Sequence, residues 1–207
     1  ILDAYMGKAP STFMHEGKEY TPKSYSESLG LKLDNYVSIS SFTHHPFYKE
    51  FVLEVPDNFS NGSFHNLPLN EFEETLDHAL QKGYTISWDT DVSESTFSAG
   101  NGLAILPTDA NREDIFTNPG AEIEVTQALR QQAFENFTTT DDHLMHITGI
   151  AKDQAGNKYY IVKNSWGNIS DYNGYIYVSA AYFRMKSISI MLHKDGIPKQ
   201  IASKLGF

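Results

Sequence analysis

Four strand-like stretches follow one another in the last third of the sequence, with only short polar segments between them. They are residues 143–151, 158–165, 174–180 and 187–193. Runs of this kind, bounded by turn-forming residues, are typical of neighbouring strands in an antiparallel sheet. The end of the chain is therefore predicted to form such a sheet.

Helical spacing of apolar residues occurs before these strands. Residues 70–82 carry one apolar stripe, with Asn70 as the expected N-cap, and a second helix is expected over residues 126–137. Thr21 followed by proline predicts the start of a short helix nearer the N-terminus. Helices early and an antiparallel sheet late indicate an α+β fold rather than alternating βαβ units.

Charge and cysteine content exclude several classes of function. The chain has 16 basic and 26 acidic residues, a net charge of −10, and no cluster of lysine and arginine. We therefore expect no nucleic-acid partner and no membrane partner. The sequence contains no cysteine. Disulfides, zinc–thiolate sites, iron–sulfur clusters and a thiol nucleophile from this chain are all excluded.

A histidine and an asparagine are expected to meet in the first hairpin of the sheet. Partners across a hairpin centred near Ala155 have residue numbers that add to about 310, and those of His143 and Asn164 add to 307. The asparagine side chain can accept a hydrogen bond from the N–H of one ring nitrogen and so aim the other nitrogen at a reacting group. Trp166 could cover the pair. A purely structural His–Asn pair on a sheet is the alternative at this point.

The segments around this pair resemble those of papain-like cysteine peptidases. Asp-His at 142–143, Lys-Asn-Ser-Trp-Gly at 163–167 and Asn-Gly-Tyr at 173–175 look like the histidine and asparagine motifs of that family. Tyr-Met-Gly at 5–7 and Trp-Asp-Thr-Asp-Val at 88–92 resemble the bleomycin hydrolase and aminopeptidase C branch. The resemblance spans nearly the whole chain, as the C-terminal portion of a protein about twice as long.

This resemblance implies a papain-like cysteine proteinase fold of the α+β class. Its C-terminal lobe would be an antiparallel, barrel-like sheet with helical insertions. Residues 1–83 would form the helical and irregular insertion region, and residues 84–207 the β-rich lobe that carries the catalytic histidine and asparagine. Both would be parts of one peptidase domain.

The resemblance also assigns the site residues. It implies that His143 is the catalytic base, that Asn164 orients it and that Trp166 shields the two from water. Asp142 matches an aspartate that often precedes the histidine, so we expect only a supporting role for it. Such enzymes require no metal and no organic cofactor.

The catalytic cysteine of the family has no counterpart here, and neither does its Gln-x-x-Gly-x-Cys-Trp-like motif. We therefore expect a fragment or processed half that is inactive alone, with the cysteine in a missing N-terminal lobe. The expected substrates are peptides with a free N-terminus, and a homo-hexamer is an option that the branch suggests. The expected location is the cytoplasm, or the periplasm or exterior if a signal peptide lies upstream. A non-catalytic papain-fold remnant that acts through interactions is the alternative.

Other candidate sites have simpler interpretations. His143 and His146 are three residues apart, which places them on opposite faces of a strand and disfavours a shared metal. His44 and His45 precede a proline in a loop and are interpreted as surface histidines. No metal ligand set is predicted.

Overall fold

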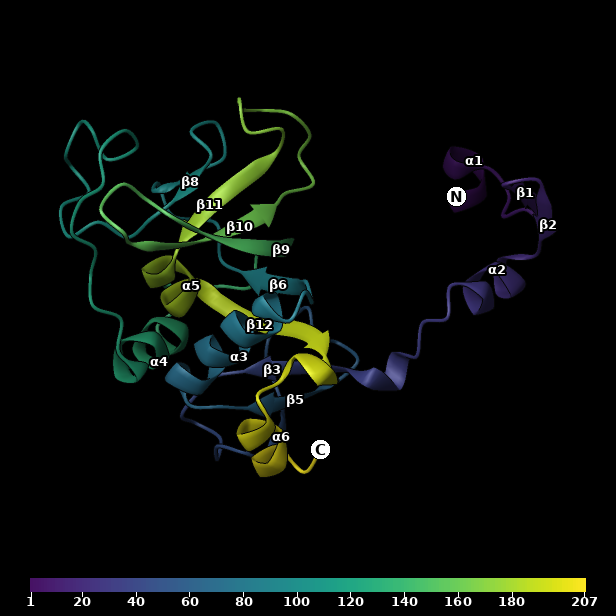
Figure 1. The fold of residues 1–207 in the computed structure, drawn as a ribbon, viewed down its shortest axis with the longest axis horizontal. Helices are drawn as coiled ribbons and strands as arrows, with labels where there is room; N and C mark the ends of the chain where they lie inside the picture. Colours follow the sequence, from purple (N-terminus) through teal and green to yellow (C-terminus); the bar gives the residue numbers. More distant parts are fainter. The chain divides into compact units, whose positions relative to one another are not determined.

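A computed structural model describes all 207 residues, which form two compact units, Ile1–Asn35 and Tyr36–Phe207 (Figure 1). The elements of the first unit are α1 (Leu2–Met6), β1 (Phe13–His15), β2 (Lys18–Tyr20), α2 (Pro22–Ser28) and the 3₁₀ turn η1 (Leu33–Asn35). The short helix predicted at Thr21 is confirmed, because the Thr21 hydroxyl accepts a hydrogen bond from the backbone N–H of Ser24 and caps α2.

The second unit is built on one sheet of ten strands. Its strands are β3 (Tyr36–Ser40), β4 (Glu50–Val52), β5 (Ser63–Asn66), β6 (Ile86–Thr90), β7 (Phe97–Ser98), β8 (Leu103–Ala104), β9 (His143–Lys152), β10 (Lys158–Lys163), β11 (Tyr175–Ser179) and β12 (Ser187–His193). Their order across the sheet is β4-β5-β3-β12-β6-β9-β10-β11-β8-β7. The four late strands predicted from the sequence are confirmed as β9 to β12.

The sheet differs from the predicted lobe in two respects. It is open and not barrel-like, because the edge strands β4 and β7 do not pair with each other, and they are only three and two residues long. Two neighbouring pairs, β3–β5 and β8–β11, are parallel, while the others are antiparallel. The early strands β3 and β6 flank β12 in the middle of the sheet, so the sheet is not confined to the end of the chain.

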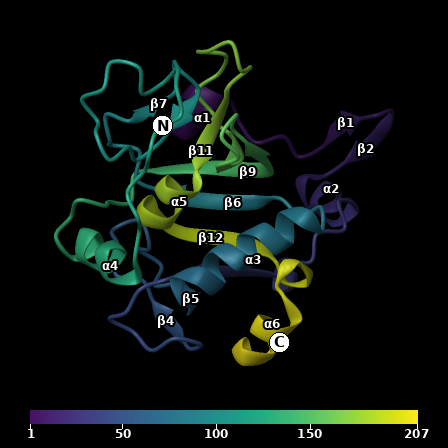
Figure 2. The same ribbon diagram turned by 60° about the vertical axis from the view of Figure 1, so that its left-hand side comes forward.

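Two helices cover the sheet face that carries most of the core. They are α3 (Leu69–Gln81) and α5 (Ala180–Lys186) (Figure 2). Phe72 of α3 stacks on Phe183 of α5 with ring centroids 5.3 Å apart, and Phe183 also contacts Trp88 of β6. All three side chains are fully buried. The apolar stripe predicted over residues 70–82 therefore packs as expected.

The start of α3 differs slightly from the prediction. The helix begins at Leu69 after Pro68, so Asn70 lies in its first turn and does not cap it. The Asn70 Oδ1 atom instead accepts a hydrogen bond from Arg184 Nη2 of α5 at 2.9 Å. Asn70, which was expected to cap α3, thus connects α3 to α5. The second predicted helix is present as α4 (Gln127–Glu135).

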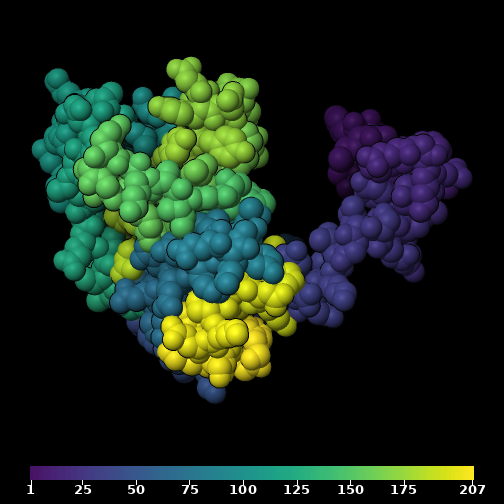
Figure 3. Space-filling view, in the orientation of Figure 1, coloured from purple at the N-terminus to yellow at the C-terminus, as the bar shows by residue number.

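The C-terminal residues pack along α3. They form the 3₁₀ turn η2 (Lys194–Gly196) and α6 (Lys199–Leu205), which lie beside α3 in the space-filling view (Figure 3). The His78 ring bonds the Gly196 carbonyl oxygen at 2.7 Å, and Ile201 is fully buried. These contacts fix the end of the chain to the core.

An ion pair is buried where α5 ends. The Lys186 side chain is 2% exposed, and its Nζ atom lies 3.3 Å from a carboxylate oxygen of Asp91, which is fully buried. Lys186 also contacts Glu94 and donates a hydrogen bond to the Thr138 carbonyl oxygen at 2.5 Å. Burial alone would raise the pKa of Asp91, but hydrogen bonds donated by Ser93 and the charge of Lys186 outweigh it and lower that pKa. The pair joins the segments around β6, α4 and α5.

The predicted boundary at residue 83 describes regions of one peptidase domain and stays a prediction. The compact units found here divide at residue 35. None of the helices has both the length and the apolar character needed to span a bilayer.

Candidate active site

The hairpin of β9 and β10 contains the predicted site. Near the turn, pairing has the register expected from the sequence, and before the irregularity Gly149 is opposite Ile161. A β-bulge then shifts the register by one residue. After it, Ile147 is opposite Val162, so Thr148 is the extra residue.

The shifted register decides which side chains share a face. Lys163 pairs with His146, and continuing the ladder places Asn164 opposite Met145. His143 is two residues from Met145 and therefore lies on the same face as Asn164, diagonally across the ladder. His146 is exposed on the other face.

His143 and Asn164 form a direct hydrogen bond. The Nε2 atom of the ring lies 2.9 Å from the Oδ1 atom of the amide, across 21 residues of sequence. Asn164 is 5% exposed, whereas His143 is half-buried. The amide is thus held in the protein while one side of the imidazole remains accessible, as a reacting group requires.

The surroundings of Asn164 determine which ring nitrogen carries the proton. Its Oδ1 atom also accepts a hydrogen bond from the backbone N–H of Ser165 at 2.7 Å, so this oxygen acts only as an acceptor. His143 must then donate through Nε2–H, which leaves a lone pair on Nδ1. The arrangement prepares Nδ1 to take a proton from an external group.

The backbone of Asn164 is fixed by the turn before β11. Its N–H donates to the carbonyl oxygen of Gly174 at 3.0 Å. Gly174 has a φ of +77°, and a Cβ there would lie 2.6 Å from the carbonyl oxygen of Gly167. Only glycine fits this close approach without a shift of the backbone. The glycine of the Asn-Gly-Tyr sequence is therefore required by the backbone packing next to the site.

Trp166 lies over the histidine ring. The two ring systems are stacked, with centroids 4.8 Å apart and an interplanar angle of 25°, and Phe97 contacts the indole from its edge. Trp166 is 46% exposed, so it covers one side of the imidazole and is itself partly open to solvent. Its predicted shielding role stays a prediction, with this stacking as the contact that would carry it.

Asp142 makes no such contact with the ring. Its Oδ1 atom accepts a hydrogen bond from the hydroxyl of Thr140 at 2.8 Å. The structure therefore brings together His143, Asn164 and Trp166, and places Asp142 beside them with a different partner.

A cavity of about 470 Å³ has His143 in its lining and contains four aspartates. They are Asp57, Asp89, Asp141 and Asp142. Asp89 extends from β6 on the face opposite Trp88, and one of its carboxylate oxygens, Oδ1, is buried without a hydrogen-bond partner. This acidic cavity is not among the sites predicted from the sequence. Two features of the sequence could have indicated it: the adjacent residues Asp141 and Asp142, and the polar residues that alternate with apolar ones along residues 84–89.

Burial and crowding favour the protonated form of two of these carboxyl groups. Burial raises the pKa of Asp89 to about 8, and the neighbouring carboxyl groups of Asp141 and Asp57 add to the effect. Burial likewise raises the pKa of Asp141. Because like charges this close disfavour joint ionisation, Asp89 holds a proton at neutral pH.

Comparison with known proteins gives the family. The sequence profile of the peptidase C1-like family matches residues 6–206, almost the whole chain. The chain belongs to the peptidase C1-like family. The predicted resemblance to papain-like peptidases is thereby confirmed, and its place beside the aminopeptidase C branch is supported by named relatives.

Those relatives of this C1-like chain are bacterial aminopeptidases. Aminopeptidase G of Lactobacillus delbrueckii subsp. lactis is 25% identical over 94% of this chain and 46% of its own length. Aminopeptidase C of Lactobacillus helveticus is also 25% identical, over 90% of this chain and 41% of its own length. The C1-like chain thus spans about half the length of the curated relatives it matches.

A solved structure supports the papain-like fold. The crystal structure of pepw from Lactobacillus rhamnosis HN001 superposes on 99% of this C1-like chain and 48% of its own, with a TM-score of 0.73 and 20% identity. The fold class predicted from the sequence is confirmed, apart from the open sheet in place of the barrel-like one.

Proposed function

We propose that this chain supplies the general base and its orienting amide to a cysteine-type aminopeptidase. The observation that carries the proposal is the 2.9 Å hydrogen bond between His143 Nε2 and Asn164 Oδ1, with Trp166 stacked on the ring. Asn164 holds the proton on Nε2, so the free Nδ1 atom is the one available for chemistry.

In the proposed reaction, His143 Nδ1 takes the proton of a cysteine thiol, and the thiolate attacks a peptide carbonyl carbon. The tetrahedral intermediate collapses when the imidazolium donates that proton to the leaving amine, which releases the amine and leaves an acyl-enzyme. His143 next takes a proton from water, whose oxygen attacks the acyl carbon and releases the carboxylic acid and the thiol. Asn164 keeps the ring oriented through these transfers.

The thiol has to come from outside residues 1–207. The sequence contains no cysteine, and the chain covers 46% of aminopeptidase G and 41% of aminopeptidase C, two of its matched relatives. We propose that an N-terminal lobe carries the cysteine, that the chain without it is inactive, and that the complete assembly forms a homo-hexamer. The names of these relatives support peptides with a free N-terminus as the substrates.

Hydrolysis of aminoacyl-coumarin substrates by the full-length protein tests the proposal. We expect turnover that iodoacetamide abolishes, that an N-acetyl group on the substrate blocks, and that His143→Ala reduces by a factor of ~10² to 10⁴. Residues 1–207 alone should give no turnover. Iodoacetamide-sensitive turnover by a pure sample of residues 1–207 would refute an external nucleophile. Equal cleavage of free and acetylated substrates would refute the aminopeptidase assignment.

A non-catalytic papain-fold module is the second candidate, and the absence of cysteine is what favours it. It predicts that the full-length protein also lacks a thiol beside His143. Labelling the full-length protein with a thiol-reactive peptide inhibitor separates the two candidates, because only the peptidase is labelled in a manner that His143→Ala prevents.

A further inference from the structure

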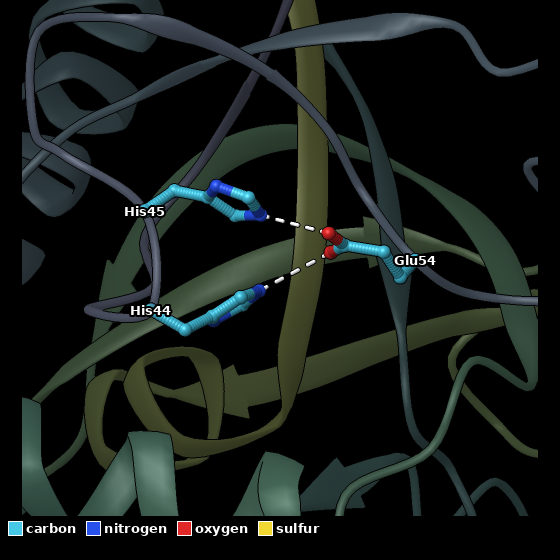
Figure 4. A group of neighbouring side chains, drawn as sticks. All are labelled: His44, His45 and Glu54. Atoms are coloured by element: carbon cyan, nitrogen blue, oxygen red, sulfur yellow. Dashed lines mark hydrogen bonds and ion pairs between the residues drawn. The ribbon is translucent and has the colours of Figure 1, made fainter.

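Three side chains converge at a second place in the larger unit, on the loops around β4. His44 and His45 lie in the loop after β3, and Glu54 follows β4 (Figure 4). The Nε2 atom of His45 is 2.8 Å from one carboxylate oxygen of Glu54, and the Nε2 atom of His44 is 3.3 Å from the other. From the sequence these two are interpreted as surface histidines, because nothing in the spacing indicates that Glu54 lies between them.

The separations of these atoms are close to those between the ligands of a tetrahedral metal ion. Zinc bonds of ~2.0–2.2 Å to nitrogen and oxygen at tetrahedral angles give ligand–ligand distances of about 3.3–3.6 Å. All three ligand atoms lie within 4.8 Å of one another. A small movement of the two rings would therefore bring all three within bonding distance of one ion.

The charge of the cluster also suits a cation. Each carboxylate oxygen of Glu54 faces one histidine ring nitrogen, and the side chain is 58% exposed, so the group stays hydrated as an ordinary negatively charged carboxylate. Both ion pairs of Glu54 are with these histidines, and no lysine or arginine pairs with it. The cluster therefore combines two nitrogen ligands with a negatively charged oxygen ligand.

Metal binding through Nε2 of His44 would change the hydrogen bond that its other ring nitrogen, Nδ1, makes. The Nδ1 atom accepts a hydrogen bond from Gln131 Nε2 at 3.0 Å, and Gln131 Oε1 accepts one from the N–H of Thr43 at 2.6 Å. In this arrangement the ring proton of His44 is on Nε2 and points at Glu54. Ligation through Nε2 moves that proton to Nδ1, so the amide of Gln131 must turn to accept it.

We propose that His44, His45 and Glu54 form a binding site for a divalent transition-metal ion such as Zn²⁺. Two imidazoles and one carboxylate are a zinc ligand set that leaves the fourth position for water. The ion would replace the two shared ring protons and connect the loop after β3 to the segment after β4. Val55, the residue after Glu54, lines the cavity that also contains His143, so the ion would fix one wall of that cavity.

Isothermal titration of the full-length, metal-stripped protein with ZnCl₂ tests the site. We expect one zinc ion per chain, and a loss of affinity of at least ~100-fold in both His45→Ala and Glu54→Gln, since removing a ligand should cost no less than removing an outer contact. Glu50→Gln is the matched control. Glu50 lies 3.7 Å from a single histidine, His65, and offers no third ligand, so this variant should bind zinc as the wild type does.

A double variant tests the role assigned to Gln131. The amide N–H of Gln131 donates a hydrogen bond to Glu135 at 2.8 Å. Swapping these two residues in the double variant Q131E/E135Q places a carboxylate against His44 Nδ1. We expect zinc affinity to rise about tenfold. Unchanged affinity in Glu54→Gln, in a sample whose circular dichroism matches the wild type, would overturn the proposal. So would an equal loss of affinity in Glu50→Gln, or the absence of any zinc binding at a millimolar concentration.

Discussion

The Nε2 atom of His143 lies 2.9 Å from the Oδ1 atom of Asn164, and that oxygen is already occupied on its other side by the backbone N–H of Ser165. The second contact matters as much as the first. It prevents the amide from presenting its NH₂ group to the ring, because that orientation would place two donors face to face. One tautomer of the histidine is therefore selected before any substrate is bound.

Exchange of each histidine on β9 distinguishes the proposed base from its neighbour. In the full-length protein, His143→Ala should lower kcat by a factor of ~10² to 10⁴, because proton transfer is lost. His146→Ala should leave kcat close to the wild-type value, because His146 lies on the other face opposite Lys163. Steady-state kinetics on an aminoacyl-coumarin gives both numbers. The reverse ranking would contradict the assignment.

Asn164 and Trp166 should act on the reaction through His143. Asn164→Ala should lower kcat more than it raises KM, and by less than His143→Ala does, because an unoriented imidazole still adopts the useful tautomer part of the time. Trp166→Ala should also lower kcat, by exposing the hydrogen bond to water. Since both act through one bond, the double variant should lose less activity than the two single losses combined. Fully additive losses, with circular dichroism unchanged, would show that the two residues act independently.

Asp89 makes stability depend on pH. Its pKa is raised from the ordinary value of 3.8 to about 8, so between these values the folded state binds a proton that the unfolded state has released. Its contribution to the free energy of unfolding is therefore complete below about pH 4 and is lost as the pH rises toward 8. Asp89→Asn should flatten this slope and raise Tm at pH 8. Urea unfolding at several pH values measures the effect, and an unchanged slope would contradict it.

The buried Lys186–Asp91 pair should be costly to break. Lys186→Met leaves a carboxylate buried without its partner and should lower the free energy of unfolding by about 3–5 kcal/mol. Adding Asp91→Asn to that variant should recover part of the loss, because the uncompensated charge is removed. Lys152→Met, an exposed lysine on β9, is the control and should change stability little. Denaturant titration compares all four proteins, and equal effects at the two lysines would contradict the argument.

Local patterns in the sequence were sufficient to predict the elements whose partners are close in the chain. The apolar stripe of α3 and the β9–β10 hairpin both depend on spacing within about twenty residues, and both are present. The position of β12 between β3 and β6 was not predictable, because it depends on pairing between residues such as Ile39 and Ile190. The same is true of Asp89 beside Asp141, which distant segments of the chain bring together. Glu54 is only 9 and 10 residues from His45 and His44, but the loop that joins them has no periodic pattern that would predict its path.

The β-bulge at Thr148 has a consequence for how this strand can change during evolution. If Thr148 paired with Val162 instead of forming the bulge, the ladder would continue in its first register and place Asn164 opposite His146, so that the amide would turn away from His143. Insertion of one residue between His143 and Thr148 is therefore equivalent to losing the His–Asn contact, even though every residue of both motifs would still be present. Deletion of Thr148, in contrast, removes only the bulge and keeps Asn164 opposite Met145. We expect length variation among relatives to collect in the exposed turn at 153–157, and relatives whose strand is one residue longer between His143 and Thr148 to have lost the His–Asn contact.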